Sequence, residues 1–115
     1  MNIILDTEDK NYLDEDMICK NSIQFHGVDF NYGIVIEECA ELIQAINKHR
    51  FNRKRDKENI YEEIADVEIT LKILKLILKS NFKDSENNIV NDAILSFKEK
   101  KLARMKKVCE TSKLI

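Results

Sequence analysis

The sequence lacks proline and tryptophan altogether and has only two glycines among its 115 residues. Because turns between strands usually draw on proline and glycine, this composition argues against a sheet protein and favours helices. Charged residues make up 35% and hydrophobic residues 43% of the chain, a mixture that suits amphipathic helices. A chain of this length predicts one domain over residues 1–115, with residues 1–13 expected to be loosely ordered.

Long apolar runs and a strong charge of one sign are absent as well. The most apolar stretch, residues 69–78, is interrupted by Lys72 and Lys75 and is far too short for a membrane span. The net charge of -2 provides no overall attraction to nucleic acid or to an anionic membrane. The N-terminus has no basic region and turns acidic at Asp6, so it does not resemble a signal peptide. We therefore expect a cytoplasmic protein with no nucleic-acid or membrane partner.

Cysteine is scarce, and the spacing of the cysteines suggests no pairs. The three cysteines, Cys19, Cys39 and Cys109, are odd in number, widely separated and without a C-x-x-C arrangement. This pattern predicts reduced, mostly buried thiols and argues against a zinc site.

Capping residues and apolar periodicity predict an all-α bundle of about four helices. Each predicted helix follows a short polar residue that can cap its first turn. The expected helices run from Asp14 or Asp16 to Gly27, from Asp29 or Asn31 to about Arg50, over residues 57–80 after Asp56, and from Ser85 to about Cys109.

Two short segments within the central helices nearly repeat each other. Residues 37–42 read E-E-C-A-E-L and residues 62–67 read E-E-I-A-D-V. Residues three apart share a helix face, so each segment presents a pair of carboxylates on one side. The pairs are Glu38 with Glu41, and Glu63 with Asp66.

The two acidic pairs are equally far from a predicted turn around Asn52. An antiparallel helix hairpin that turns there would bring both pairs to the same height, facing each other. The acids also border the apolar stripes of their helices instead of facing open solvent. The predicted stripes are Val35, Cys39, Leu42, Ile43 and Ile46 on the first helix of the hairpin, and Ile60, Ile64, Val67, Leu71, Leu74 and Leu78 on the second.

Four carboxylates that face each other repel, and burying them is costly unless a cation joins them. Oxygen ligands alone select a hard cation, so Mg²⁺ fits best and Mn²⁺ can substitute for it. The alternative is an ordinary solvated acidic face. The matched pairs favour the metal site, with Glu38, Glu41, Glu63 and Asp66 as metal ligands and catalytic residues.

Two basic groups are candidates for binding phosphate. One is a cluster around the turn that includes Lys54; the other is the last helix, where Lys101 and Arg104 are three residues apart and can reach one phosphate together. Loop solubility and complementation of the helix dipole are equally good explanations of the turn cluster, and most cations of the last helix must be solvated.

The aromatic residues and histidines allow two interpretations. Phe25, Phe30 and Tyr32 can flank a nucleotide base, but we expect them in the core. His26 and His49 lack the E-x-x-H spacing of di-iron bundles, and we expect them to be surface or helix-end residues.

The double acidic motif followed by a late Lys/Arg pair resembles the MazG-like all-α nucleoside triphosphate pyrophosphohydrolases. The resemblance covers about residues 20–107 and includes the stretch His26-Gly27-Val28-Asp29 before the first motif. It implies a central antiparallel helix hairpin and a homodimer or a tetramer. It also implies that the four motif acids bind Mg²⁺ and that Lys101 and Arg104 contact phosphates.

The function that follows from the metal site and the resemblance is Mg²⁺-dependent hydrolysis of a nucleoside triphosphate. Cleavage between the α and β phosphates would yield a monophosphate and pyrophosphate, with Glu38 or Glu41 accepting a proton from water. Two alternatives remain open. One is a non-enzymatic helical interaction module with a structural cation; the other is a related phosphohydrolase with different products.

Overall fold

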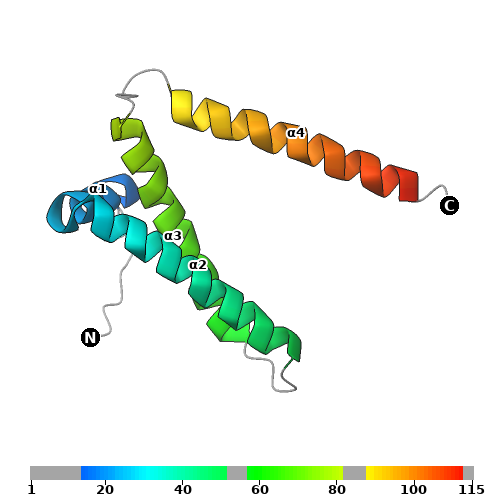
Figure 1. The fold of residues 1–115 in the computed structure, drawn as a ribbon, viewed down its shortest axis with the longest axis horizontal. Helices are drawn as coiled ribbons and strands as arrows, with labels where there is room; N and C mark the ends of the chain where they lie inside the picture. The colour runs from blue at the N-terminus through cyan, green and yellow to red at the C-terminus, as the bar shows by residue number, and fades with distance from the viewer. Residues whose placement is uncertain (1–13, 52–56, 82–87, 113–115) are drawn as a thin grey trace. The chain divides into compact units, whose positions relative to one another are not determined.

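A computed structural model describes residues 14–51, 57–81 and 88–112, and every secondary-structure element in these ranges is a helix (Figure 1). The predicted all-α fold class is therefore confirmed. None of the helices, within the described residues, is long and apolar enough to cross a membrane. The helices are α1 (Glu15–His26), α2 (Val28–Phe51), α3 (Lys57–Asn81) and α4 (Ile89–Ser112).

The chain divides into two compact units, the first ending at Ile77 and the second beginning at Leu78. The first unit contains α1, α2 and most of α3. The second contains the last residues of α3 and all of α4, and the two are described separately below. Predicted features that fall on residues 1–13, 52–56 and 82–87, including the caps Asp56 and Ser85, lie outside the described residues.

The first helix begins and ends where its capping residues predict. The Asp14 side chain accepts a hydrogen bond of 3.1 Å from the backbone N–H of Met17, which satisfies a donor of the first turn. At the other end Gly27 adopts φ 89°, a value that favours glycine, and its N–H donates to the carbonyl of Ile23 at 2.8 Å. Both ends are therefore fixed by local chemistry.

The second helix begins earlier than predicted, at Val28, directly after Gly27. The prediction that Asp29 or Asn31 caps it was wrong, because both residues lie inside the helix. Asn31 is only 1% exposed and turns its amide back toward α1. There its Nδ2 donates to the carbonyls of Gly27 (2.7 Å) and Ser22 (3.2 Å), so it joins two helices instead of capping one.

The core of the first unit lies where α1, α2 and α3 meet. Three of its members, Cys19, Ile73 and Ile77, are buried. The predicted stripe of α3 was partly wrong, since Ile64 and Leu71 are exposed while Ile73 and Ile77 face the core. The physical reason is that α1 packs on α3 beside the predicted stripe. The half-buried members of the core are Ile23, Tyr32 and Leu76.

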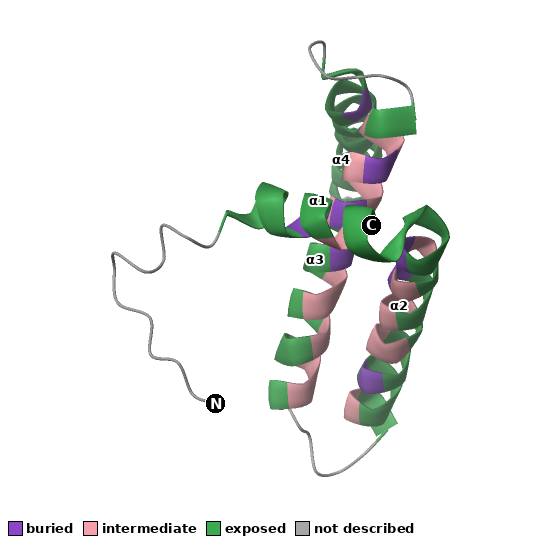
Figure 2. Cartoon of the chain, turned by 90° about the vertical axis from the view of Figure 1, so that its left-hand side faces the viewer, coloured by how far each residue is buried: buried purple, intermediate pink, exposed green. Residues whose placement is uncertain are grey.

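The hairpin of α2 and α3 is the feature that positions the site. The two helices lie side by side and run in opposite directions (Figure 2). The turn predicted around Asn52 falls on residues 52–56, which lie outside the described residues. Residues on the facing sides of the two helices therefore lie opposite one another.

The second unit is built on α4. This helix begins at Ile89, after Asn88, whose φ is 50° and whose carbonyl accepts a 2.9 Å hydrogen bond from the N–H of Asp92. It extends slightly beyond the predicted end at Cys109.

Candidate metal centre

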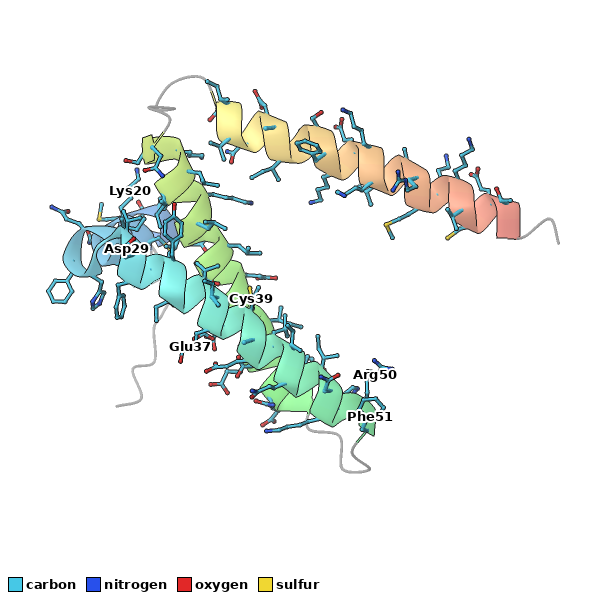
Figure 3. All side chains as sticks on the ribbon, viewed as in Figure 1. Lys20, Asp29, Glu37, Cys39, Arg50 and Phe51 are labelled. Carbon is cyan, nitrogen blue, oxygen red and sulfur yellow. The ribbon has the colours of Figure 1, made fainter. Side chains whose placement is uncertain are left out.

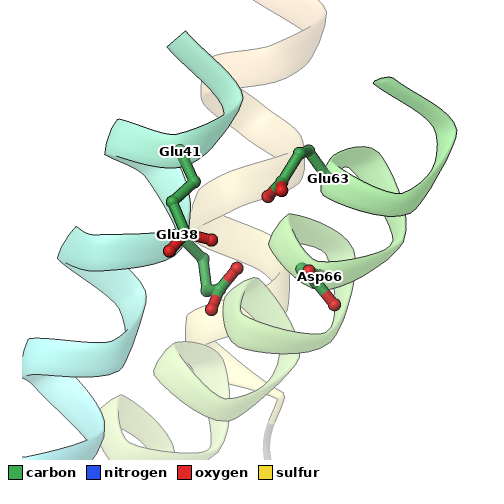
Figure 4. A group of neighbouring side chains, drawn as sticks. All are labelled: Glu38, Glu41, Glu63 and Asp66. Atoms are coloured by element: carbon green, nitrogen blue, oxygen red, sulfur yellow. The ribbon is translucent and has the colours of Figure 1, made fainter. Parts of the chain in front are cut away.

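The four motif acids converge between α2 and α3 (Figure 4). One carboxylate oxygen from each of the four side chains can be chosen such that all these atoms lie within 4.8 Å of one another. All four side chains are half-buried. The residues of the cluster, called the acidic quartet from here on, are Glu38, Glu41, Glu63 and Asp66.

The geometry of two antiparallel helices explains this convergence. Glu38 and Glu41 are one turn apart on α2, and Glu63 and Asp66 are one turn apart on α3. Because the helices run in opposite directions, Glu41 emerges on the side of Glu63 and Glu38 on the side of Asp66 (Figure 4). The hairpin thus folds two short sequence motifs into one site.

The acidic quartet has unsatisfied oxygens. Atoms Oε2 of Glu38 and Oε2 of Glu63 are shielded from solvent and have no hydrogen-bond partner within the described part of the chain. Among the lysines and arginines whose side chains the structure describes, none forms an ion pair with any of the four acids. Buried carboxylate oxygens without a donor or a cation are unfavourable, so the arrangement calls for a positive ligand.

The raised pKa values within the quartet also indicate a site for a positive ligand. The pKa of Glu38 is raised to about 7, chiefly by burial. Repulsion from Glu41, Asp66 and Glu63 and a hydrogen bond with Glu41 contribute to the same rise. Burial also raises the pKa of Glu63, with further contributions from Glu41, Asp66 and Glu62. Without a cation, the quartet therefore retains a proton near neutral pH, and a cation that binds must displace it.

The donor set and the dimensions suit a hard divalent cation. The group contains only carboxylates and no histidine or cysteine, and such oxygen donors favour Mg²⁺ or Mn²⁺ over zinc or copper. Opposite ligands of Mg²⁺, each at about 2.1 Å, lie about 4.2 Å apart. The 4.8 Å limit on the quartet is close to that value.

The predicted phosphate-binding residues belong to other parts of the chain. Lys101 and Arg104 are exposed on α4 in the second unit, and their role stays a prediction. Lys54 lies outside the described residues. At the end of α2, the guanidinium of Arg50 lies over the ring of Phe51, 5.0 Å from Cζ to the ring centroid (Figure 3).

Several predictions about single residues need correction. Phe25 is 83% and Phe30 51% exposed, so neither belongs to the core. They flank His26, whose ring stacks on Phe30 with centroids 4.5 Å apart. All three cysteines are free as predicted, but only Cys19 is buried, whereas Cys39 is half-buried and Cys109 exposed.

Two buried polar residues near the quartet were not anticipated from the sequence. Asn31 lies seven residues before Glu38 on α2, and Thr70 lies four residues after Asp66 on α3. Thr70 is 4% exposed, and its hydroxyl donates to the carbonyl of Val67 at 3.0 Å. Both spacings place the residue on the inner face of its helix, a signal that could have revealed them.

Comparison with known proteins adds one match. A family model described as the MazG nucleotide pyrophosphohydrolase domain matches residues 29–109. The matched range contains both acidic motifs and the basic residues of α4. Neither a curated protein nor a solved structure matches the chain significantly.

Proposed function

Since the chain belongs to the MazG nucleotide pyrophosphohydrolase family, we propose that it hydrolyses a nucleoside triphosphate between the α and β phosphates. The products are a nucleoside monophosphate and pyrophosphate. The observation that carries this proposal is the acidic quartet, whose carboxylate oxygens converge within 4.8 Å without a positive partner in the described residues.

In this proposal the acidic quartet holds Mg²⁺, with Mn²⁺ as a substitute. When bound, the cation neutralises the charge of the triphosphate and makes the attacking water more acidic. The chain itself supplies the base: a carboxylate oxygen of Glu38 or Glu41 accepts the proton that the water loses as it attacks phosphorus. Half-burial of the quartet strengthens its attraction for a cation, because fewer waters compete and screen it.

The remaining charge of the triphosphate needs cations from the protein. We assign this role to Lys101 and Arg104, which are three residues apart on one side of α4, and to Lys54. The planar guanidinium of Arg104 can bind two phosphate oxygens at once, and the ammonium of Lys101 acts as a point charge.

We further propose that the protein acts in the cytoplasm as a homodimer or a tetramer. Free thiols at all three cysteines are compatible with a reducing compartment. Large apolar side chains such as Ile36 (71% exposed) and Ile43 (60% exposed) on α2 provide surface for a second copy. Light scattering that reports a stable monomer at working concentration would contradict the oligomer.

The direct test is product analysis with a panel of canonical and modified triphosphates. The proposal expects Mg²⁺-dependent formation of pyrophosphate and monophosphate from at least one of them, and loss of the reaction in EDTA. Formation of diphosphate and orthophosphate instead would indicate a different phosphohydrolase.

A non-enzymatic module with a structural cation accounts equally well for the unsatisfied oxygens of Glu38 and Glu63. The two functions differ in their response to a triphosphate that resists cleavage. An α,β-methylene analogue should raise the melting temperature only in the presence of Mg²⁺ if the quartet binds substrate. The module predicts stabilisation by Mg²⁺ alone.

A further inference from the structure

Helix α1 is attached to both helices of the hairpin. It is joined to α2 by hydrogen bonds between Ser22 and Asn31. It is joined to α3 by the packing of Cys19 with Ile73 and Ile77. We call these two attachments the α1 bridge. It links α2 and α3 through a third helix.

The attachment to α2 depends on one side chain. Asn31 uses both kinds of hydrogen-bonding group of its amide: Oδ1 accepts from the hydroxyl of Ser22 at 3.1 Å, and Nδ2 donates to the carbonyls of Ser22 and Gly27. The residue is 1% exposed, so water does not replace these partners. Removing the amide would leave buried polar groups unpaired, which makes the attachment sensitive to substitution.

The attachment to α3 combines apolar packing with an ion pair. Beside the buried contact of Cys19 with Ile73 and Ile77, Nζ of Lys72 lies 2.5 Å from Oδ1 of Asp16 on α1. This pair is partly exposed to solvent and contributes little to stability by itself. The apolar contact is therefore the main part of this attachment.

The two attachments lie on the same side of the acidic quartet, at matching distances from it along their helices. Asn31 lies seven residues before Glu38 on α2, and Ile73 lies seven residues after Asp66 on α3. Seven residues are two helical turns, or about 10.5 Å. Because the helices are antiparallel, both attachments lie at the end of the hairpin opposite the turn. The chain itself connects α2 to α3 at one end, and the α1 bridge connects them at the other.

Repulsion within the acidic quartet acts against this arrangement, since four nearby carboxylates push the helices apart. We propose that Asn31 is a positioning residue, which holds α2 to α3 through α1 and so fixes the spacing of the quartet. A cation site tolerates errors of only about 0.2 Å in its ligand distances, so a small splaying of the helices matters. The proposal rests on the proposed function only where it concerns the cation.

The spacing can be measured without a metal. Glu37 and Glu62 are exposed neighbours of the quartet on α2 and α3, so Glu37→Cys and Glu62→Cys can carry spin labels. Cys39→Ser and Cys109→Ser remove the accessible thiols, while Cys19 is buried. Double electron–electron resonance then gives the distribution of distances between the helices. The variants compared in this background are Asn31→Ala, the milder Ser22→Ala, and Val90→Ala as a control in the second unit.

Cation affinity is measured in parallel on unlabelled chains, with Mn²⁺ as a paramagnetic probe. Asn31→Ala should broaden the distance distribution and weaken Mn²⁺ binding about 10-fold, the usual effect of losing support for a metal ligand. Ser22→Ala, which removes one hydrogen bond, should have a smaller effect of the same kind. Val90→Ala should lower the melting temperature and change neither measurement.

The outcomes separate the two proposals. A distribution that is unchanged in both Asn31→Ala and Ser22→Ala overturns the positioning role. A broadened distribution with Mn²⁺ affinity no weaker than that of Val90→Ala also overturns it, because the effect on the helices would then have no consequence for the site. If the unmodified chain binds no Mn²⁺ but Asn31→Ala still broadens the distribution, the positioning of the helices stands and the proposed function fails.

Discussion

A carboxylate oxygen of Glu38 on α2 lies within 4.8 Å of one on Asp66 of α3, in a group of four acids. No lysine or arginine with a described side chain forms an ion pair with either residue. The packing of the helices keeps the four carboxylates together although their charges repel each other. The free energy stored in this repulsion is available to a cation that enters, which couples metal binding to the stability of the hairpin.

Neutralising one acid of the quartet should abolish the reaction and preserve the fold. Glu38→Gln and Asp66→Asn each remove a charged ligand, so we expect pyrophosphate release to fall at least about 100-fold, as for loss of a catalytic base or of metal support. The helical circular dichroism should be unchanged. In EDTA the melting temperature of both variants should rise, because the repulsion in the quartet is smaller.

The matched control for these substitutions is Glu37→Gln. Glu37, labelled in Figure 3, is adjacent to Glu38 in sequence but is exposed and is not a member of the quartet. It should retain pyrophosphate release. Activity that survives in both Glu38→Gln and Asp66→Asn, or that is lost equally in Glu37→Gln, would contradict the assignment of the site.

The stability of the metal-free protein should depend on pH in a defined direction. The pKa of Glu38 is raised from 4.5 to about 7, so the folded state binds its proton more tightly than the unfolded state does. Stability from this group is fully present below about pH 4.5 and is lost as the pH rises through about 7. Because Mg²⁺ must displace that proton, stabilisation by Mg²⁺ should increase over the same range.

Melting temperatures in EDTA and in Mg²⁺, measured at several pH values between 5 and 8, test this dependence. The two curves should diverge with rising pH. In Glu38→Gln the decline of the metal-free curve should be much smaller. An Mg²⁺ effect of constant size across this range would show that no proton is displaced when the cation binds.

The hairpin and its site were predictable because their determinants are short-range or repeated. Asp14 and Gly27 fix the ends of α1 through bonds to residues only a few positions away. The register of α2 against α3 follows from two nearly identical motifs at equal distances from the predicted turn. Once the motifs are on facing helices, the convergence of Glu38 and Asp66 needs no further information.

The features that escaped prediction depend on contacts between distant segments. Asn31 was expected at a helix cap, because an asparagine near a helix start has that role in most local contexts. Its actual partners, Ser22 and Gly27, belong to the preceding helix and its end. Likewise the burial of Ile73 depends on where α1 packs, and a single apolar stripe does not describe a helix with two neighbours.

The two glycines should respond to alanine in opposite ways. Gly27 adopts φ 89°, so Gly27→Ala should destabilise the protein by about 1 kcal/mol through backbone strain alone, because an added Cβ meets nothing within 4 Å. Gly33 lies inside α2, also with nothing within 4 Å of an added Cβ. Gly33→Ala should stabilise by about 0.5–1 kcal/mol, since alanine favours the helix.

Chemical denaturation in EDTA measures both effects, and each variant is the control for the other. If Gly27→Ala were as stable as the unmodified protein, the connection between α1 and α2 would not require its positive φ. In that case Asn31, which bonds to the carbonyl of Gly27, would also be less tightly placed than the structure indicates.

The basic residues of α4 should affect substrate binding and leave the cation site intact. Lys101→Ala and Arg104→Ala should each raise the KM for the triphosphate about 10-fold, in line with the loss of a charge-assisted hydrogen bond. Mn²⁺ affinity without nucleotide should not change. Arg104→Lys should recover only part of the loss, because an ammonium cannot make the two parallel bonds of a guanidinium.

Lys106→Ala is the control on the same helix, since Nζ of Lys106 lies 3.9 Å from the carboxylate of Glu110, one turn away, in an exposed pair. Its KM should remain that of the unmodified protein. An equal rise in KM for Lys106→Ala would mean that α4 attracts the triphosphate only through its overall charge. That effect would fade as salt is added, because exposed charges are screened. A direct contact from Lys101 or Arg104 would keep its difference from the control in high salt.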